Sequence, residues 1–175
     1  DFVQFAEYAV NKAYESKAAS PEELSSKVAE FEGELSAVAG KVGEKTVVSR
    51  LSRIENAGGA VIDYIHYGSR LGVLVNYDNL PADKVESFVA LGRNIAIQAV
   101  AMNPVVTYRD EVDKTLIEKE LDIYRDIARQ EKKPENIIER IAEGKLNKYF
   151  QEICLFEQSY FSENSKQIKD LISDY

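Results

Sequence analysis

A densely charged segment in the C-terminal half places the tightest limit on the fold. From Asp113 onward, apolar residues are spaced by four, three and four positions, which is the heptad seam of packed helices. These apolar positions are Ile117, Leu121, Tyr124 and Ala128. Pro134 interrupts the pattern and opens a second apolar series that ends at Ile153. We therefore predict an antiparallel coiled-coil hairpin over about residues 114–153, which is too thin to bury its whole surface and should protrude.

Two helices are predicted at the start of the chain. Phe2 and Phe5 open a series of apolar residues at three- and four-residue spacing, so the first helix should begin almost at the terminus. Ser20 is followed three residues later by a glutamate, which is the capping-box pattern of a helix start. The second helix is predicted over residues 21–39, with Gly40 as its C-terminal cap.

The middle of the chain is predicted to contain strands. Residues 47–54 are rich in β-branched side chains and should form a strand that ends before Gly58 and Gly59. Residues 60–67 and 72–77 are predicted to pair as an antiparallel hairpin across a short glycine-containing turn.

A helix over residues 84–102 should follow the sheet, because Asn103 and Pro104 then stop the apolar pattern. After the coiled-coil hairpin we expect a loop or short strand over residues 155–161 and a final amphipathic helix within residues 165–175. Helices combined with small antiparallel sheets indicate an α+β chain.

Charge and composition exclude several functions. The chain has 175 residues with 22 Lys plus Arg against 30 Asp plus Glu, a formal net charge of -8. This acidity argues against direct binding of nucleic acid, which needs basic surfaces. The length corresponds to one domain, or to two small lobes that share a core.

Reactive residues are scarce. Cys154 is the single cysteine and His66 the single histidine, so the chain can form neither an internal disulfide nor a thiolate cage for zinc, and it has no second imidazole for a metal pair. We find no motif for nucleotide binding, zinc proteolysis or serine hydrolysis, and we expect no enzyme and no cofactor. No apolar run is long enough to span a membrane, and a reducing, cytoplasmic location fits best. Because the chain begins with Asp1, we expect a fragment of a longer protein.

These features favour a binding protein. Carboxylates such as Glu118 and Asp122 fall on the charged faces of the predicted hairpin, where a solvated surface is the simpler explanation. His66, beside a predicted turn, has either a structural role or a role in contacting a partner. One interpretation is an adaptor or chaperone-like protein that presents the arms of its hairpin to an unrelated client.

A second interpretation comes from a resemblance carried by short segments along nearly the whole chain. They are Asp1-Phe2-Val3, Lys41-Val42-Gly43-Glu44, the hairpin from Tyr64 to Val75, Ala96-Ile97-Gln98, Met102-Asn103-Pro104, Lys133-Pro134-Glu135, Glu143-Gly144-Lys145-Leu146, Glu152-Ile153-Cys154-Leu155 with Gln158, and Lys166-Gln167-Ile168. Their order resembles that of the elongation factor Ts family, the guanine nucleotide exchange factors of the GTPase elongation factor Tu.

The resemblance implies a two-lobed α+β core, with lobes at about residues 1–58 and 59–175, built of small antiparallel sheets packed with helices. A coiled-coil hairpin at about residues 114–153 would protrude from it. The family acts in protein biosynthesis by binding its partner rather than by catalysing a reaction. The family's N-terminal ubiquitin-associated-like module and its closing C-terminal segments have no counterpart in this sequence.

Candidate contact residues follow from the matching positions. Asp1, Phe2 and Val3 match the family segment that reaches the partner's nucleotide domain and displaces Mg²⁺, with the Phe2 ring as the wedge. The other expected partner contacts are Val42 and Gly43, in a loop that touches the same domain, His66, and Phe161, which matches a contact with the partner's third domain. At the last of these, Ser159-Tyr160-Phe161 replaces the more usual Pro-Phe-Val.

Overall fold

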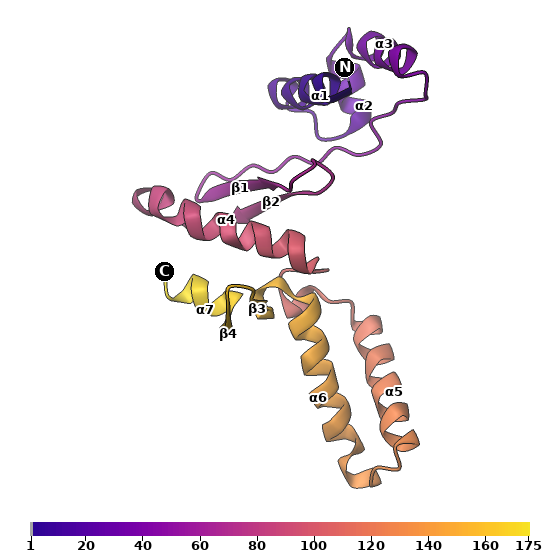
Figure 1. The fold of residues 1–175 in the computed structure, drawn as a ribbon, viewed down its shortest axis with the longest axis vertical. Helices are drawn as coiled ribbons and strands as arrows, with labels where there is room; N and C mark the ends of the chain where they lie inside the picture. The colour runs from indigo at the N-terminus through magenta and orange to yellow at the C-terminus, as the bar shows by residue number, and fades with distance from the viewer. Residues whose placement is uncertain (1) are drawn as a thin grey trace. The chain divides into compact units, whose positions relative to one another are not determined.

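A computed structural model describes residues 2–175 of the chain (Figure 1). Helices and two small antiparallel sheets make up the regular structure, which confirms the α+β class. The chain divides into two compact units, Asp1–Glu55 and Asn56–Tyr175. That the chain has two functional lobes, divided between residues 58 and 59, stays a prediction.

The first unit is a small helical core. It contains α1 (Phe2–Ser16), α2 (Pro21–Lys27) and α3 (Phe31–Val42). Aromatic rings join these helices, since the ring centroids of Phe5 and Phe31 lie 5.8 Å apart. The buried residues of this core are Phe5, Ala9, Ala13, Ala18, Leu24, Val28, Phe31 and Val38.

The predicted capping box starts α2. The Ser20 hydroxyl accepts a hydrogen bond from the Glu23 N–H at 3.2 Å, and the Glu23 carboxylate accepts one from the Ala19 N–H at 3.1 Å. The helix predicted over residues 21–39, however, is wrong in its length, because the chain breaks at Val28 and restarts at Phe31. Both side chains are buried, and the break lets α3 turn back onto the core.

The strand predicted over residues 47–54 is also wrong. Within residues 2–55 the structure assigns no strand, and both sheets belong to the second unit. A β-branched run forms a strand only when another strand satisfies its backbone groups. Here Val48 and Leu51 instead pack against the helical core of the first unit.

The second unit begins with the predicted β-hairpin. The strands β1 (Ala60–Ile65) and β2 (Gly72–Tyr77) pair in antiparallel register, with Ile62 opposite Val75. After the short 3₁₀-helix η1 (Ala82–Lys84), α4 (Val85–Met102) packs against both strands.

The contact between α4 and the sheet is close because Gly92 has no side chain. A Cβ at this buried position would overlap the end of the Ile62 side chain and press on the Phe88 ring. The Tyr77 hydroxyl donates a hydrogen bond to the Gly92 carbonyl at 2.8 Å. Burial of this hydroxyl raises the pKa of Tyr77 well above its ordinary value.

Two long helices form the predicted hairpin. They are α5 (Lys114–Gln130), which follows the 3₁₀-helix η2 (Arg109–Glu111), and α6 (Glu135–Ile153). The two pack against each other along their lengths, burying Ala128, Ile138 and Ala142 (Figure 1). That they form a coiled coil stays a prediction.

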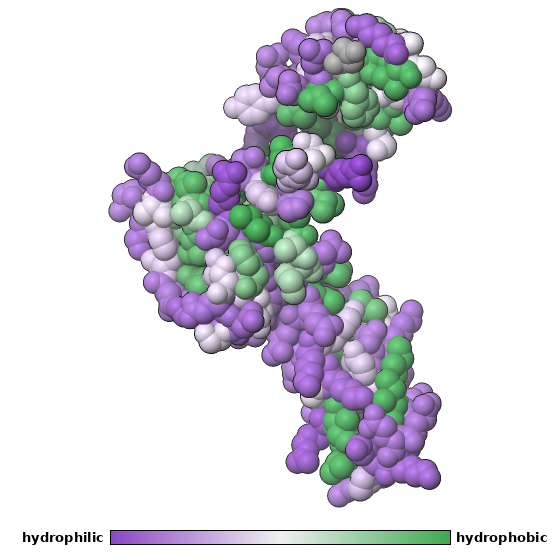
Figure 2. Space-filling view, in the orientation of Figure 1, coloured by the Kyte–Doolittle hydropathy of each residue, from purple (hydrophilic) through white to green (hydrophobic). Residues whose placement is uncertain are grey.

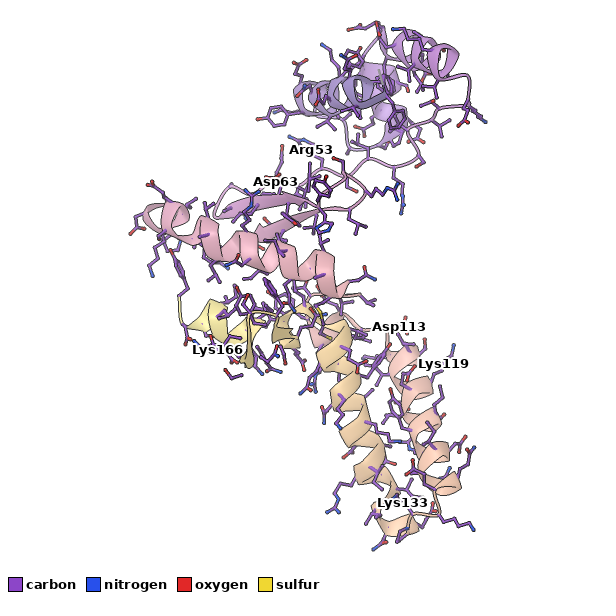
Figure 3. All side chains as sticks on the ribbon, viewed as in Figure 1. Arg53, Asp63, Asp113, Lys119, Lys133 and Lys166 are labelled. Carbon is purple, nitrogen blue, oxygen red and sulfur yellow. The ribbon has the colours of Figure 1, made fainter. Side chains whose placement is uncertain are left out.

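Charged side chains cover the hairpin. Arg125 on α5 pairs with Glu139 on α6 at 2.6 Å and with Asp122 at 2.9 Å. Figure 3 shows Asp113 at one end of the hairpin and Lys133 at the turn between the helices. On the face drawn in Figure 2, hydrophilic residues predominate over both helices. Exposed ion pairs contribute little stability, so the buried apolar seam must hold the two helices together.

The C-terminal segment contains η3 (Leu155–Glu157), β3 (Ser159–Tyr160), β4 (Glu163–Gln167) and α7 (Ile168–Ser173). The final helix therefore begins later than residue 165, because β4 pairs with β3 in the second small sheet. Ile168, at the start of α7, joins Ile95 of α4 and Leu155 in a buried cluster. This cluster fixes the C-terminal segment against α4.

Gly59 is a site at which the fold requires the absence of a side chain. A Cβ there would overlap the backbone carbonyl oxygen of Tyr77, whereas a Cβ on Gly58 would meet nothing within 4 Å. We expect Gly59→Ala to lower the free energy of unfolding by about 1–3 kcal/mol, because backbone must move to admit the methyl group. Gly58→Ala should change it by less than about 0.5 kcal/mol. Urea unfolding followed by circular dichroism compares the two, and equal effects would contradict this packing.

Candidate partner-binding site

The first turn of α1 presents apolar side chains to solvent. Phe2 is 57% exposed and Val3 is 67% exposed, whereas Phe5 on the same helix is 7% exposed. A helix with buried anchors at Phe5 and Ala9 holds its outward residues in defined directions. Asp1, the other predicted member of this segment, lies outside the described residues.

An apolar groove runs beside Phe2 within the first unit. Its volume is about 310 Å³, and it lies between α1 and the extended segment at residues 46–51. Its lining residues on the helices are Phe2, Phe5, Ala6, Ala9, Val10 and Leu24. Phe2 therefore lines an apolar groove while more than half of the residue's surface remains exposed.

Val42 and Gly43 lie at the end of α3. Val42 is 44% exposed, and Gly43 takes a left-handed conformation with φ at 75°. The Gly43 N–H donates to the Ala39 carbonyl at 2.9 Å and so caps the helix. Gly43 ends α3, rather than Gly40 as predicted, because only the later glycine has the positive φ that terminates the helix.

His66 lies at the turn of the β1–β2 hairpin. Its side chain is exposed, and its Nδ1 lies 3.0 Å from the Tyr64 hydroxyl. The backbone N–H of His66 donates to the Leu71 carbonyl at 2.8 Å, which closes the turn. The His66 ring is thus held at Nδ1 by its neighbour on β1.

Phe161 follows β3 in the second unit. It is 44% exposed, and its ring meets the Tyr160 ring edge-on with centroids 5.0 Å apart. Tyr160 is half-buried and packs on the cluster formed by Ile95, Leu155 and Ile168. The exposed ring of Phe161 therefore lies beside the ring of Tyr160, which is packed on the buried cluster.

The predicted contact residues thus fall into two sets. Phe2, Val3, Val42 and Gly43 belong to the first unit, where α1 and α3 pack against each other. His66 and Phe161 belong to the second unit. Each described member of both sets is exposed, as a residue that meets a partner must be.

Sequence reasoning assigned no role to two buried glutamines in the second unit. Gln98 on α4 is 0% exposed and Gln158 is 1% exposed. The sequence did contain one sign of an unusual role for Gln98, because it is the single amide side chain in the apolar run that precedes Asn103. A buried amide must find hydrogen-bond partners, and its place on an otherwise apolar helix face indicates a specific structural task.

A second unpredicted cluster joins the hairpin to the rest of its unit. The Arg109 guanidinium binds Glu157 through two nitrogens at 2.7 and 2.6 Å and donates to Asn147 at 2.9 Å. It also lies 4.3 Å from the Phe150 ring centroid. The hydrogen bonds to Glu157 raise the pKa of Arg109, so the cation is retained.

The described residues provide little for bond-making chemistry. Within residues 2–175 there is no group of three or more His, Cys, Asp or Glu side chains that could hold a metal ion. Cys154 is buried, and burial raises the pKa of its thiol, which disfavours the reactive thiolate. No helix among the same residues is both long and apolar enough to cross a membrane.

The contrast between Phe2 and Phe5 has a direct consequence for stability. We expect Phe5→Ala to lower the free energy of unfolding by about 3–5 kcal/mol, because it empties the aromatic centre of the first unit. Phe2→Ala should lower it by no more than about 0.5 kcal/mol, because the ring is largely in water already. Urea unfolding of the two variants measures both values. A large loss for Phe2→Ala would show that the ring belongs to the core.

Comparison with known proteins assigns the family. The family model described as Elongation factor TS matches residues 1–175. A protein of Chlorobium limicola named Elongation factor Ts is 38% identical over 181 residues, covering 99% of this chain and 62% of the relative. A protein of the same name from Thermotoga petrophila is 40% identical over 137 residues, covering 77% of this chain and 67% of the relative.

A third relative, from Prosthecochloris aestuarii, carries the same name and is 35% identical over 182 residues, covering 100% of this chain and 62% of the relative. The chain thus spans about three fifths of the length of the Chlorobium and Prosthecochloris proteins. A match over every residue of the chain, together with these identities, is decisive: the chain belongs to the elongation factor Ts family.

Proposed function

We propose that this chain acts in translation elongation by binding elongation factor Tu in its GDP-bound state and promoting GDP release. In this proposal it displaces Mg²⁺ and distorts the nucleotide site of the GTPase, and GTP then binds to the emptied site. The chain makes and breaks no covalent bond. The family supports the role in elongation, and we place the activity in the cytoplasm.

The nucleotide site of a GTPase is sensitive to small displacements. GDP is held by backbone N–H groups, a lysine and a Mg²⁺ ion whose octahedral geometry tolerates little change. A side chain that shifts these groups by about an ångström weakens several contacts at once. An exchange factor therefore needs a rigidly held wedge rather than catalytic groups.

Linkage then gives the direction of the effect. A protein that binds the nucleotide-free GTPase more tightly than the nucleotide-bound GTPase lowers the affinity of the GTPase for nucleotide. By linkage, bound nucleotide lowers the affinity of the GTPase for that protein by the same factor. GTP, the more abundant nucleotide in cells, can refill the site and release the factor.

The observation that carries the proposal is the exposure of Phe2 on an anchored helix. Phe2 is 57% exposed at the start of α1, while Phe5 fixes the same helix in the core. Burying a phenylalanine side chain contributes about 2–3 kcal/mol, which corresponds to an affinity change of about a hundredfold. We assign Phe2, with Asp1 and Val3, to the contact that displaces Mg²⁺.

The remaining contacts are assigned by exposure and resemblance. Val42 and Gly43 are exposed at the end of α3 and would touch the nucleotide domain of the partner. His66 has Nε2 available at the hairpin turn, and Phe161 offers an exposed ring for the third domain. The net charge of -8 gives no support for direct contact with nucleic acid.

We expect Phe2→Ala to slow GDP release from elongation factor Tu about a hundredfold at a subsaturating concentration of the chain, because the wedge is removed. Stopped-flow release of a fluorescent GDP analogue measures the rate. Tyr14→Ala is the matched control, since Tyr14 is a 77% exposed aromatic residue on the same helix. Equal rates for the Phe2 variant and the parent would overturn the assignment.

The hairpin distinguishes an exchange factor from an adaptor that holds its client with the arms of α5 and α6. Deleting residues 124–130 and 135–141 removes one heptad from each arm and keeps the phase of the apolar seam. We expect GDP release to fall less than about threefold, because the Phe2 contact that we assign to the wedge lies in the first unit and not on the hairpin. Loss of all binding to elongation factor Tu in a pull-down would instead favour the adaptor.

A further inference from the structure

Gln98 is a fully buried polar side chain in α4, and its position is not explained by the fold alone. The surrounding α4 residues Ile95 and Ala96 are buried as well, at 1% and 0% exposure. A buried amide without hydrogen bonds is costly, so an apolar residue would be the simpler choice for this helix face. The amide is tolerated here because its partners lie on one short segment, residues 158–161.

The hydrogen bonds of Gln98 determine the orientation of its amide. The Phe161 N–H can only donate and lies 2.9 Å from Oε1, while the Ser159 carbonyl can only accept and lies 3.0 Å from Nε2. Nε2 also donates to Oε1 of Gln158 at 3.3 Å. One side chain therefore binds the segment both before and after Tyr160.

The second glutamine ties the same segment to the end of α6. Nε2 of Gln158 donates to the Glu152 carbonyl at 2.8 Å, and the Gln158 carbonyl accepts from the Ile168 N–H at 3.0 Å. Gln158 is itself 1% exposed. Gln98 thus binds a segment, residues 158–161, whose first residue is already fixed by hydrogen bonds to Glu152 and Ile168.

The local sheet cannot hold Phe161 by itself. β3 has only two residues, and its register with β4 shifts between Ser159 and Tyr160. Phe161 lies just past the end of β3, and its N–H is bonded to the Gln98 side chain instead of to a strand. The Gln98 side chain therefore accepts the hydrogen bond from a backbone N–H that the interrupted strand pairing leaves without a partner strand.

We propose that Gln98 is a positioning residue that presents the Phe161 ring to the partner, because its amide donates a hydrogen bond to the Ser159 carbonyl and accepts one from the Phe161 N–H. The inference rests on the proposed function for the identity of the partner. With the segment held on both sides, Tyr160 turns into the Ile95 cluster and Phe161 stays outside it. Without the amide, the Phe161 backbone is free to leave this conformation.

The first test measures the backbone of Phe161 directly. Gln98→Met keeps the volume of the side chain and removes its hydrogen bonds. We expect hydrogen exchange at the Phe161 amide, followed by NMR, to become about tenfold faster, the effect of losing one hydrogen bond. The amide of Ala128 in α5 should be unchanged.

Ile95→Val is the matched control, because it disturbs the same buried cluster on the same helix without touching the amide. It should leave exchange at Phe161 within about twofold of the parent, since no hydrogen bond to that N–H is lost. If Gln98→Met does not fold, Gln98→Asn withdraws the amide by one methylene and should accelerate exchange in the same way. Unchanged protection at Phe161 in the folded variant overturns the proposal.

The second test is a double-mutant cycle on binding to nucleotide-free elongation factor Tu. We expect Phe161→Ala to raise Kd about tenfold, as loss of an interface aromatic does. Gln98→Met should raise Kd in the parent, yet have no further effect once Phe161 is alanine. If the increase in Kd of the double variant is the product of the increases caused by the two single substitutions, Gln98 does not act through Phe161, and the proposal is overturned.

The two tests separate this inference from the proposed function. If the parent chain does not bind elongation factor Tu, the proposed function fails, while amide exchange still decides whether Gln98 holds Phe161. If the parent binds and Phe161 stays protected without the Gln98 amide, the positioning role fails and the proposed function stands.

Discussion

A two-stranded hairpin cannot bury enough apolar surface to be stable alone in water, and this constraint makes α4 the element on which the second unit depends. β1 and β2 pack against α4, with Gly92 leaving space for the Ile62 side chain. The C-terminal segment packs on the same helix through Ile95 and Ile168. The hairpin turn with His66 and the segment with Phe161 are therefore both supported by α4.

Two exposed aromatic residues of the candidate site, Phe2 and Phe161, share one physical arrangement. Phe2 is exposed three positions before the buried Phe5, and Phe161 is exposed beside the half-buried Tyr160. A buried neighbour fixes the backbone, so the exposed ring loses little conformational freedom when a partner covers it. This arrangement is consistent with the proposed displacement of groups in a partner, because a ring whose backbone is fixed keeps its position on contact. It requires no catalytic group.

Part of this organisation was predictable because it depends on neighbours in sequence. Heptad spacing indicated the helices that became α5 and α6, and the capping box at Ser20 indicated the start of α2. The β1–β2 hairpin was predictable because a tight turn separates two short apolar runs. The exposure of Phe2 did not follow from the apolar spacing, which includes the buried Phe5 as well, and was implied only by the family resemblance.

Spacing and turn residues a few positions apart were enough to specify the local elements, namely the helical hairpin, the β-hairpin and the starts of the capped helices. Other features depended on packing between distant parts of the chain. Residues 47–54 have the composition of a strand but no partner strand, so they pack on helices instead. Gln98 finds its partners 60 or more positions along the chain, at Gln158 and Phe161. Local preference cannot decide such cases, because the free energy of a buried polar group or an unpaired strand depends on what lies opposite it.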